Sequence, residues 1–154
     1  MKAHKRAYSL VELIVVVLSI GILATVVAPR LNIAAITKHK AEAAARKLVI
    51  DLRRTRRLAI ANAAINTRGF KLKMTKPSPY YTAYEIENMN TGETMDSHTL
   101  DSKVLCKADG EFMFGPLGNL RSGSGTQIVL ASAGGKSFAI TIIPATGMIK
   151  CTEN

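Results

Sequence analysis

The feature that most constrains this fold is an uncharged run near the N-terminus, Leu13–Ala28, which reads LIVVVLSIGILATVVA. Extended back to Ala7, the stretch holds 22 residues and a single ionisable group, Glu12. Because a helix needs about 20 apolar residues to cross a bilayer, the run predicts a helix that is able to span a membrane. A carboxylate within such a helix is costly to bury, so Glu12 is a candidate functional group.

Charge divides the chain into three parts that the overall figure of +10 conceals. Residues 1–29 carry +2, residues 30–76 carry +11 and residues 77–154 carry −3. With 47% hydrophobic residues the chain is not a disordered tail protein. The uneven charge also argues against an ordinary, evenly basic soluble domain. We therefore expect a spanning helix, a basic helix and a slightly acidic domain.

Three interpretations of the N-terminal segment compete. A removable secretory signal would need cleavage after Ala28, but Pro29 would then follow the cut, where its fixed φ and missing N–H suit a protease poorly. A plain membrane anchor would use Ser9 and Glu12 as a capping box that satisfies a free N–H at the helix start. The third interpretation gives the Glu12 carboxylate a function of its own.

The third interpretation agrees with a resemblance to the N-termini of type IV pilins and type II secretion pseudopilins. The leader MKAHKRA is basic, Tyr8 opens the hydrophobic helix, and Glu12 is the fifth residue after a cut between Ala7 and Tyr8. Pro29 falls where the family often places a helix-bending proline. The family usually has glycine before the cut, where this chain has Ala7.

The resemblance implies a mechanism of processing and assembly. A prepilin peptidase in the membrane would remove residues 1–7 and methylate the new amine of Tyr8. In a filament, the Glu12 carboxylate would neutralise the α-amino group of a neighbouring subunit, a strong contact in a medium of low dielectric. The resemblance also places the leader in the cytoplasm and the rest of the chain beyond it.

The residues that follow the apolar run continue a helical pattern. Residues 30–67 contain no glycine or proline, and Gly69 follows where a helix should end. With the apolar run, this pattern predicts one helix over Tyr8–Thr67, about 90 Å long at 1.5 Å per residue. Small or apolar residues recur at helical spacing on one face, at Ala41, Ala45, Leu48, Leu52, Thr55 and Ala59.

Four arginines crowd the polar side of this helix, namely Arg53, Arg54, Arg56 and Arg57. Clustered arginines suit phosphate contacts with nucleic acid. No aromatic residue interleaves the cluster, however, so it offers no platform on which a base can stack. A solvated helix face that meets acids of the head or of adjacent subunits is the simpler interpretation, and attraction to anionic lipid headgroups is a third.

After Gly69 the periodicity changes from helical to alternating. Phe112–Gly118 and the last predicted strands resemble the H-type minor pseudopilins of type II secretion and the related fimbrial T-type minor pilins. Some fimbrial T-type relatives bind DNA through arginines near the C-terminus, whereas residues 147–154 of this chain hold one lysine and one glutamate. Eight short strands separated by turn residues are predicted at 70–74, 80–86, 94–100, 103–107, 111–114, 127–131, 137–143 and 148–151.

Cys106 and Cys151 are the only cysteines, and the resemblance places both outside the cytoplasm. An even pair in an oxidising compartment favours a disulfide; two unpaired thiols on separate strands are the alternative. Catalysis has little support, since the sequence lacks a nucleophile elbow, a zinc-protease motif and a P-loop. The acids of the β region also lack the spacing of a calcium loop. The sequence predicts no enzyme, no cofactor and no metal site.

Together these observations predict an α+β, pilin-like fold: a long N-terminal helix with a membrane-spanning first half, packed on a small antiparallel β-sheet head domain. The expected parts are a leader at 1–7, a transmembrane assembly helix at 8–29, the periplasmic half of the helix at 30–68 and a β-rich head at 69–154.

The resemblance implies a minor pseudopilin, a structural subunit of a type II secretion system or type IV pilus-like filament in a bacterial inner membrane and periplasm. Its partners would be other pilins or pseudopilins, the prepilin peptidase and the membrane. A DNA-binding minor pilin for DNA uptake or adhesion, and an anchored β domain that never polymerises, stay open as alternatives.

Overall fold

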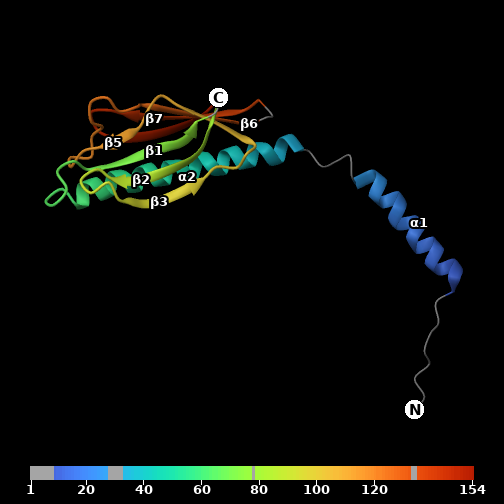
Figure 1. Ribbon diagram of the computed structural model, residues 1–154. Coiled ribbons are helices and arrows are strands. Elements are labelled where there is room, and N and C mark those ends of the chain that lie inside the picture. Colours follow the sequence, from blue (N-terminus) through green and yellow to red (C-terminus); the bar gives the residue numbers. More distant parts are fainter. Residues whose placement is uncertain (1–8, 28–32, 78, 133–134) are drawn as a thin grey trace, which may run out of the picture. The chain divides into compact units, whose positions relative to one another are not determined.

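The computed structural model describes residues 9–27, 33–77, 79–132 and 135–154 (Figure 1). The chain divides into two compact units, Met1–Ile33 and Ala34–Asn154. The first unit contains helix α1, Leu10–Val27. The second contains helix α2, Ile33–Ala61, from its second residue onward, together with all the strands described.

Helix α1 is apolar on all sides. It has 18 residues, LVELIVVVLSIGILATVV, and Glu12 is its only charged residue. The hydroxyls of Ser19 and Thr25 donate hydrogen bonds to carbonyl oxygens four and three residues earlier, both at 2.8 Å, so their polarity is satisfied within the helix. The side chains of residues 10–25 are all exposed, which means that this helix buries no face within its own unit.

The predicted fold class is wrong. The sequence predicted one helix over Tyr8–Thr67 with a membrane-spanning first half and a head packed on its second half. The described residues instead form two helices, of 18 and 29 residues, and a sheet of eight strands. Among the described residues, no helix is both long enough and apolar enough to cross a membrane.

Helix α2 ends at Ala61, before the predicted end at Thr67. Two asparagine side chains form hydrogen bonds with main-chain groups there. The Asn62 Nδ2 donates to a carbonyl oxygen four residues earlier at 2.9 Å. The Asn66 Oδ1 accepts a hydrogen bond from the Gly69 N–H at 2.7 Å, and its Nδ2 donates to the Gly69 carbonyl at 2.9 Å. Such side-chain bonds compete with helical ones, so the helix stops and the chain turns toward the sheet.

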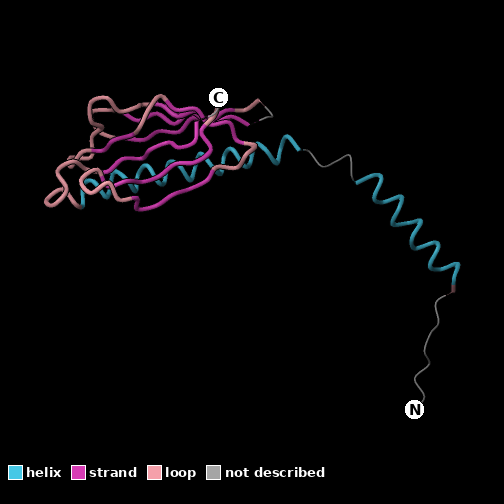
Figure 2. The backbone as a smooth tube through the Cα atoms, viewed as in Figure 1, coloured by secondary structure: helices cyan, strands magenta, loops and turns pink. Residues whose placement is uncertain are grey.

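The sheet is antiparallel throughout its described pairings. Figure 2 shows its strands in magenta alongside the cyan helix α2. Hydrogen-bonded neighbours follow the order β5-β1-β2-β4-β6-β7-β8, and β3 pairs with β2 beside this path. Each predicted strand overlaps an observed one, so the eight strand positions are confirmed. The strands are β1 Phe70–Pro77, β2 Tyr81–Asn88, β3 Thr94–Thr99, β4 Val104–Ala108, β5 Phe112–Phe114, β6 Gln127–Ser132, β7 Ser137–Ile143 and β8 Met148–Glu153.

The predicted stripe of α2 forms the helical side of the core and is confirmed. All six stripe residues are buried, and all of them except Thr55 share one hydrophobic cluster with alternate residues of the strands. The burial of Leu48 and Leu52 stabilises the fold. Truncating either residue to alanine would lower the free energy of unfolding by about 2–5 kcal/mol. The largest fully buried strand residues of this cluster are Leu72, Tyr84, Phe112, Phe114, Ile128, Leu130, Ile140 and Ile142.

Gly69 permits the close approach of two strands at the end of the helical connection. Its φ of +86° lies in the left-handed region that favours glycine. A Cβ at this position would lie 2.0 Å from the carbonyl oxygen of Phe114. The start of β1 therefore passes the end of β5 at a distance that no side chain allows.

Asp109 fastens the turn after β4 to the start of β6. Its carboxylate accepts hydrogen bonds from the N–H of Thr126 at 2.9 Å, the N–H of Gln127 at 3.0 Å and the Thr126 hydroxyl at 3.1 Å. Burial acts to raise the pKa of the Asp109 carboxyl, but these hydrogen bonds outweigh burial and hold the pKa below its usual value.

Candidate functional site

Glu12 lies in the first turn of α1, and its side chain is exposed. The main chain closes the start of this helix, because the Leu13 N–H donates to the Ser9 carbonyl at 3.2 Å. The capping box that the sequence allowed is not formed: no hydrogen bond joins the Glu12 carboxylate to Ser9 or to another residue that the structure describes. Within the described residues, this acid has no partner.

The predicted processing site lies outside the described residues, since Ala7 and Tyr8 belong to the segment 1–8. The same holds for Pro29, the predicted helix bend. Of the residues assigned to processing and assembly, only Glu12 has a described position.

The four arginines of the basic cluster do not share one face. Arg54 turns toward β3, where its Nη1 lies 2.5 Å from the Asp96 Oδ2. This hydrogen bond, with a smaller contribution from His98, holds the pKa of the Asp96 carboxyl below its usual value. Arg54 is therefore engaged within the sheet unit, as the interpretation of a helix face that meets acids of the head expects.

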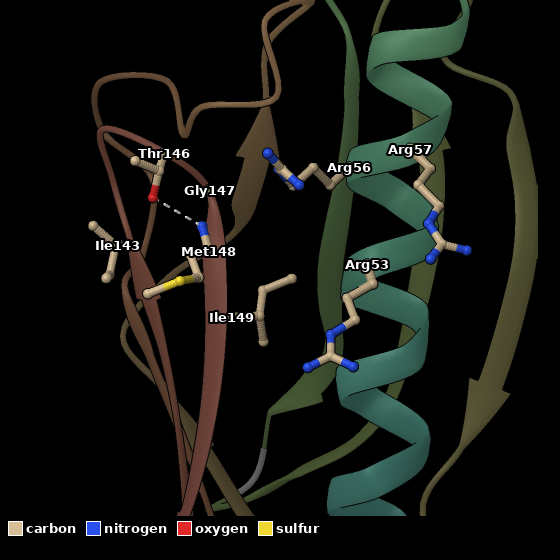
Figure 3. Close-up of a pocket in the computed structure, with 8 residues that line it drawn as sticks. All are labelled: Arg53, Arg56, Arg57, Ile143, Thr146, Gly147, Met148 and Ile149. Atoms are coloured by element: carbon tan, nitrogen blue, oxygen red, sulfur yellow. Dashed lines mark hydrogen bonds between the residues drawn. The ribbon is translucent and has the colours of Figure 1, made fainter.

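The other three arginines line one groove, which we call the α2–β8 groove (Figure 3). In Figure 3, Arg53 and Arg56 extend from α2 toward β8. The groove has a volume of about 530 Å³. Its lining residues are Arg53, Arg56, Arg57, Ile143, Thr146, Gly147, Met148 and Ile149.

One end of the groove is built by two glycine turns in contact. Arg56 Nε donates to the Gly118 carbonyl at 3.0 Å, which fixes this guanidinium beside the turn. Gly147 has a φ of +63°, and a Cβ there would lie 1.9 Å from the same carbonyl oxygen. The turn between β7 and β8 therefore needs glycine to close against Gly118, and this contact sets the end of the groove.

Arg53 and Arg57 both line the groove; in Figure 3, Arg53 extends toward β8, whereas the side chain of Arg57 lies along α2 and turns away from it. Both are exposed, and neither makes a hydrogen bond or an ion pair with a residue that the structure describes. A second hollow of about 270 Å³ continues along the same helix and strand, and Arg53 belongs to both. Its lining is Arg46, Val49, Ile50, Arg53 and Cys151.

A buried polar cluster between α2 and the sheet was not predicted. Asp51 is 1% exposed, and its Oδ2 accepts a hydrogen bond of 2.6 Å from the hydroxyl of Tyr84, which is also 1% exposed. Its Oδ1 accepts one of 3.0 Å from Lys47 Nζ. Asp51 stands three residues after Leu48 and four before Thr55, so its position within the apolar stripe was the sequence signal that could have revealed it.

His98 completes this cluster without a hydrogen bond. Its Nε2 lies 3.6 Å from Asp51 Oδ2 and 3.4 Å from Asp96 Oδ2, and it is buried with no hydrogen-bond partner among the described atoms. Burial, and then the hydrogen bond to the Asp51 carboxylate, raise the pKa of the Tyr84 hydroxyl. Because Asp51 and Tyr84 are both covered, the cluster stabilises the packing of α2 on the sheet and offers no surface to a substrate.

The predicted Cys106–Cys151 disulfide is not formed, and both thiols are free. Cys106 lies on β4 and Cys151 on β8, with β6 and β7 between these strands. Three strand spacings of about 4.8 Å separate the two by roughly 14 Å, beyond the ~7 Å limit for the Cα atoms of a disulfide. Burial raises the pKa of the Cys106 thiol to about 12, whereas Cys151 is exposed.

In the part of the chain that the structure describes, no group of three histidine, cysteine or acidic residues is placed to hold a metal ion. The chain was also compared with models of protein families, with curated proteins and with solved structures. None of these three comparisons found a match.

Proposed function

We propose that the protein is a minor pseudopilin-like structural subunit of a type II secretion system or type IV pilus-like filament. A prepilin peptidase would cut it between Ala7 and Tyr8, and copies would assemble through α1. The proposal places the stored subunit at a bacterial inner membrane, with the sheet-containing unit on the periplasmic side. The observation that carries it is α1 itself, an apolar helix that is exposed all round and holds one charged residue.

An apolar helix of this kind is stable when other apolar surface covers it. A helix that is hydrophobic on all sides belongs to a buried position, and α1 finds none within its own unit. Leu10, Val11 and Leu13 are among its residues with more than half of their surface exposed. Each side chain of this size gains about 1.5–3 kcal/mol on full burial, so a bundle of such helices is strongly favoured.

Glu12 would give that bundle its register. A carboxylate buried among apolar helices without a partner is costly, and a cationic group placed beside it removes much of this cost. In the proposal this group is the α-amino group of Tyr8 in a neighbouring subunit, which exists only after cleavage. The lack of a described partner for Glu12 supports this assignment.

Intact mass spectrometry of the full chain tests the processing step. Expressed in a cell with an active prepilin peptidase, the chain should lose the seven residues 1–7 and gain one methyl group. A chain that still begins at Met1 under these conditions would refute the proposal.

Glu12→Gln tests the assembly step, with Ser19→Ala as the matched control on the same helix. The control removes a hydroxyl that is satisfied within α1, and it should leave the yield of filaments unchanged. Glu12→Gln should be processed normally but incorporated poorly, which filament shearing and immunodetection would measure. Normal incorporation of Glu12→Gln would remove the role of this residue and leave processing untouched.

The DNA-binding alternative stays a prediction. Three of its four arginines line the α2–β8 groove, while Arg54 is engaged by Asp96. A gel-shift titration with duplex DNA would test it, because phosphate contacts make affinity fall steeply with salt. No shift at low salt would end this alternative.

A further inference from the structure

We propose that the α2–β8 groove binds an acidic polypeptide segment in extended conformation, which adds to the sheet as a further strand along β8. The inference does not depend on the proposed filament role. It rests on three features of the sheet-containing unit: an unpaired strand edge, unneutralised arginines and exposed apolar side chains that border the same groove.

The strand edge is the first feature. β8 is the last strand in the order of the sheet, so among the strands that the structure describes it has a neighbour on one side only. Ser137 and Asn154 exchange both main-chain hydrogen bonds, at 2.9 Å and 3.4 Å. Because bonded and non-bonded pairs alternate along an antiparallel ladder, the N–H and C=O groups of Ile149, Cys151 and Glu153 point to the free edge. Such an edge is a template for an added strand.

The charge of the groove selects the kind of segment. Arg53 and Arg57 have no described acidic partner, whereas Arg46, two helical turns before Arg53 along the second hollow, is paired with Glu42 at 2.6 Å. Glu153, the one acid on β8, is already held by Lys38 and Lys136 at 3.1 Å and 2.9 Å. The groove therefore presents an excess of positive charge, and carboxylates of a bound segment would neutralise it.

The spacing of an extended segment fits this arrangement. Side chains on one face of a strand repeat every second residue, at about 6.6–6.8 Å. The arginines follow one helix at intervals of one to two turns, which is about 5–11 Å. A segment with acidic residues at alternate positions thus keeps a carboxylate near each arginine, while its other face is free for apolar residues.

Apolar side chains complete the fit. Met148 is 54% exposed and Ile143 is 39% exposed, and both line the groove. Ile50, which lines the second hollow, is 58% exposed. These residues would bury surface against apolar side chains of the segment. The same lining holds no aromatic residue, so a nucleic acid would find phosphate contacts but no stacking and no use for the strand edge.

Fluorescence anisotropy with the full chain tests the proposal. The probe is a labelled peptide of alternating glutamate and valine, of the same six-residue length as β8 and capped at both ends. We expect salt-sensitive binding. A peptide with glutamine in place of glutamate should bind at least about tenfold more weakly, and so should a peptide with methylated backbone nitrogens, since each loses one class of contact.

Two variants locate the site. Arg53→Gln combined with Arg57→Gln should weaken binding about tenfold, because it removes the two unpaired charges of the groove. Its control is Arg54→Gln combined with Arg68→Gln, which removes the same charge from other positions and should bind normally. Cys151→Pro removes one N–H of the free edge without removing a ladder bond, so it should abolish binding while the circular dichroism stays unchanged.

The remaining outcomes each overturn the proposal. Equal loss in both arginine double variants would show non-specific attraction, and equal binding of the methylated peptide would exclude strand addition. A single-stranded oligonucleotide that binds more tightly than the peptide would displace it. If this displacement occurs and Cys151→Pro leaves the affinity for that oligonucleotide unchanged, the groove would be assigned to nucleic acid. A chain that ignores the peptide but dimerises, and loses the dimer with Cys151→Pro, would assign the edge to a second copy.

Discussion

Removing the hydroxyl of Tyr84 tests the buried polar cluster most directly. In Tyr84→Phe the Asp51 Oδ2 loses the 2.6 Å hydrogen bond that it accepts, while Oδ1 keeps the bond from Lys47. His98 does not replace the lost donor in the present geometry, since its Nε2 is 3.6 Å away and makes no hydrogen bond. A hydrogen bond to a charged group contributes about 1.5–3 kcal/mol, so we expect the free energy of unfolding to fall by about 2–3 kcal/mol.

Urea unfolding of the full chain in a mild detergent measures this change. The chain has no tryptophan, so far-ultraviolet circular dichroism is the suitable signal. Tyr81→Phe is the matched control, because Tyr81 lies on the same strand and its hydroxyl makes no hydrogen bond to a described residue. The control should lose less than about 0.5 kcal/mol. A loss in Tyr84→Phe no larger than in the control would refute the role assigned to this bond.

A double-mutant cycle separates the Tyr84–Asp51 pair from its surroundings. Asp51→Ala alone leaves the Tyr84 hydroxyl buried without an acceptor, so the two single variants share one broken bond. The double variant should therefore be more stable than the sum of the single losses predicts, by about 1–3 kcal/mol. Additive losses would mean that the two groups do not interact.

Alkaline pH provides an independent measurement of the same contact. Burial and the Asp51 carboxylate raise the pKa of Tyr84 in the folded chain above the value of about 10 in the unfolded chain. The resulting stability is fully present below pH 10 and declines as the pH rises above it, because only the unfolded chain releases the proton. The decline should be weaker in Tyr84→Phe, and an equal decline in both proteins would contradict this assignment.

Three further predictions concern other parts of the sheet-containing unit. Gly69→Ala should destabilise the fold by more than about 3 kcal/mol, because the new Cβ would clash with the Phe114 carbonyl oxygen. Gly92 has a φ of +73° and open space around it, so Gly92→Ala should cost only the ~1–2 kcal/mol of a left-handed residue. Equal losses in thermal unfolding would exclude the clash at Gly69. Asp109→Asn should remove part of the acid dependence of stability. The folded pKa of Asp109 is lowered, so its contribution is present above about pH 4 and lost below it; acid titrations that superimpose would argue against this clamp. In the native chain, a thiol reagent should label Cys151 quickly and Cys106 only on unfolding. If mass spectrometry shows that neither cysteine is labelled in the absence of a reductant, the two cysteines are joined in a disulfide after all.

The strands and the buried face of α2 follow directly from sequence periodicity. Alternation after Gly69 marked eight strands, and the four-and-three spacing from Ala41 to Ala59 marked the stripe that packs on them. Both patterns are local consequences of how side chains project from a strand and a helix. The extent of the helices was not predictable in this way. Asn62 and Asn66 end α2 through hydrogen bonds whose competition with the helix cannot be ranked from spacing alone.

The candidate sites divide along the same line. Glu12 was found from the sequence because one acid in an uncharged run needs no tertiary information to be conspicuous. The four arginines were also conspicuous, but only the structure separated Arg54, held by Asp96, from the three that line the groove with β8.

The sequence by itself determined the unequal partition of charge and apolar residues: an uncharged helix with one acid, a basic helix and alternating strands. Only the tertiary structure decided that the apolar run forms a helix of its own, that Asp51 and Tyr84 meet, that β6 and β7 separate the strands of the two cysteines and that β8 is a free edge beside three arginines. The physical reason is that propensity and periodicity act between neighbours in the chain. Pairing of distant strands, and the groups they leave unpaired, depends on contacts that sequence spacing does not encode.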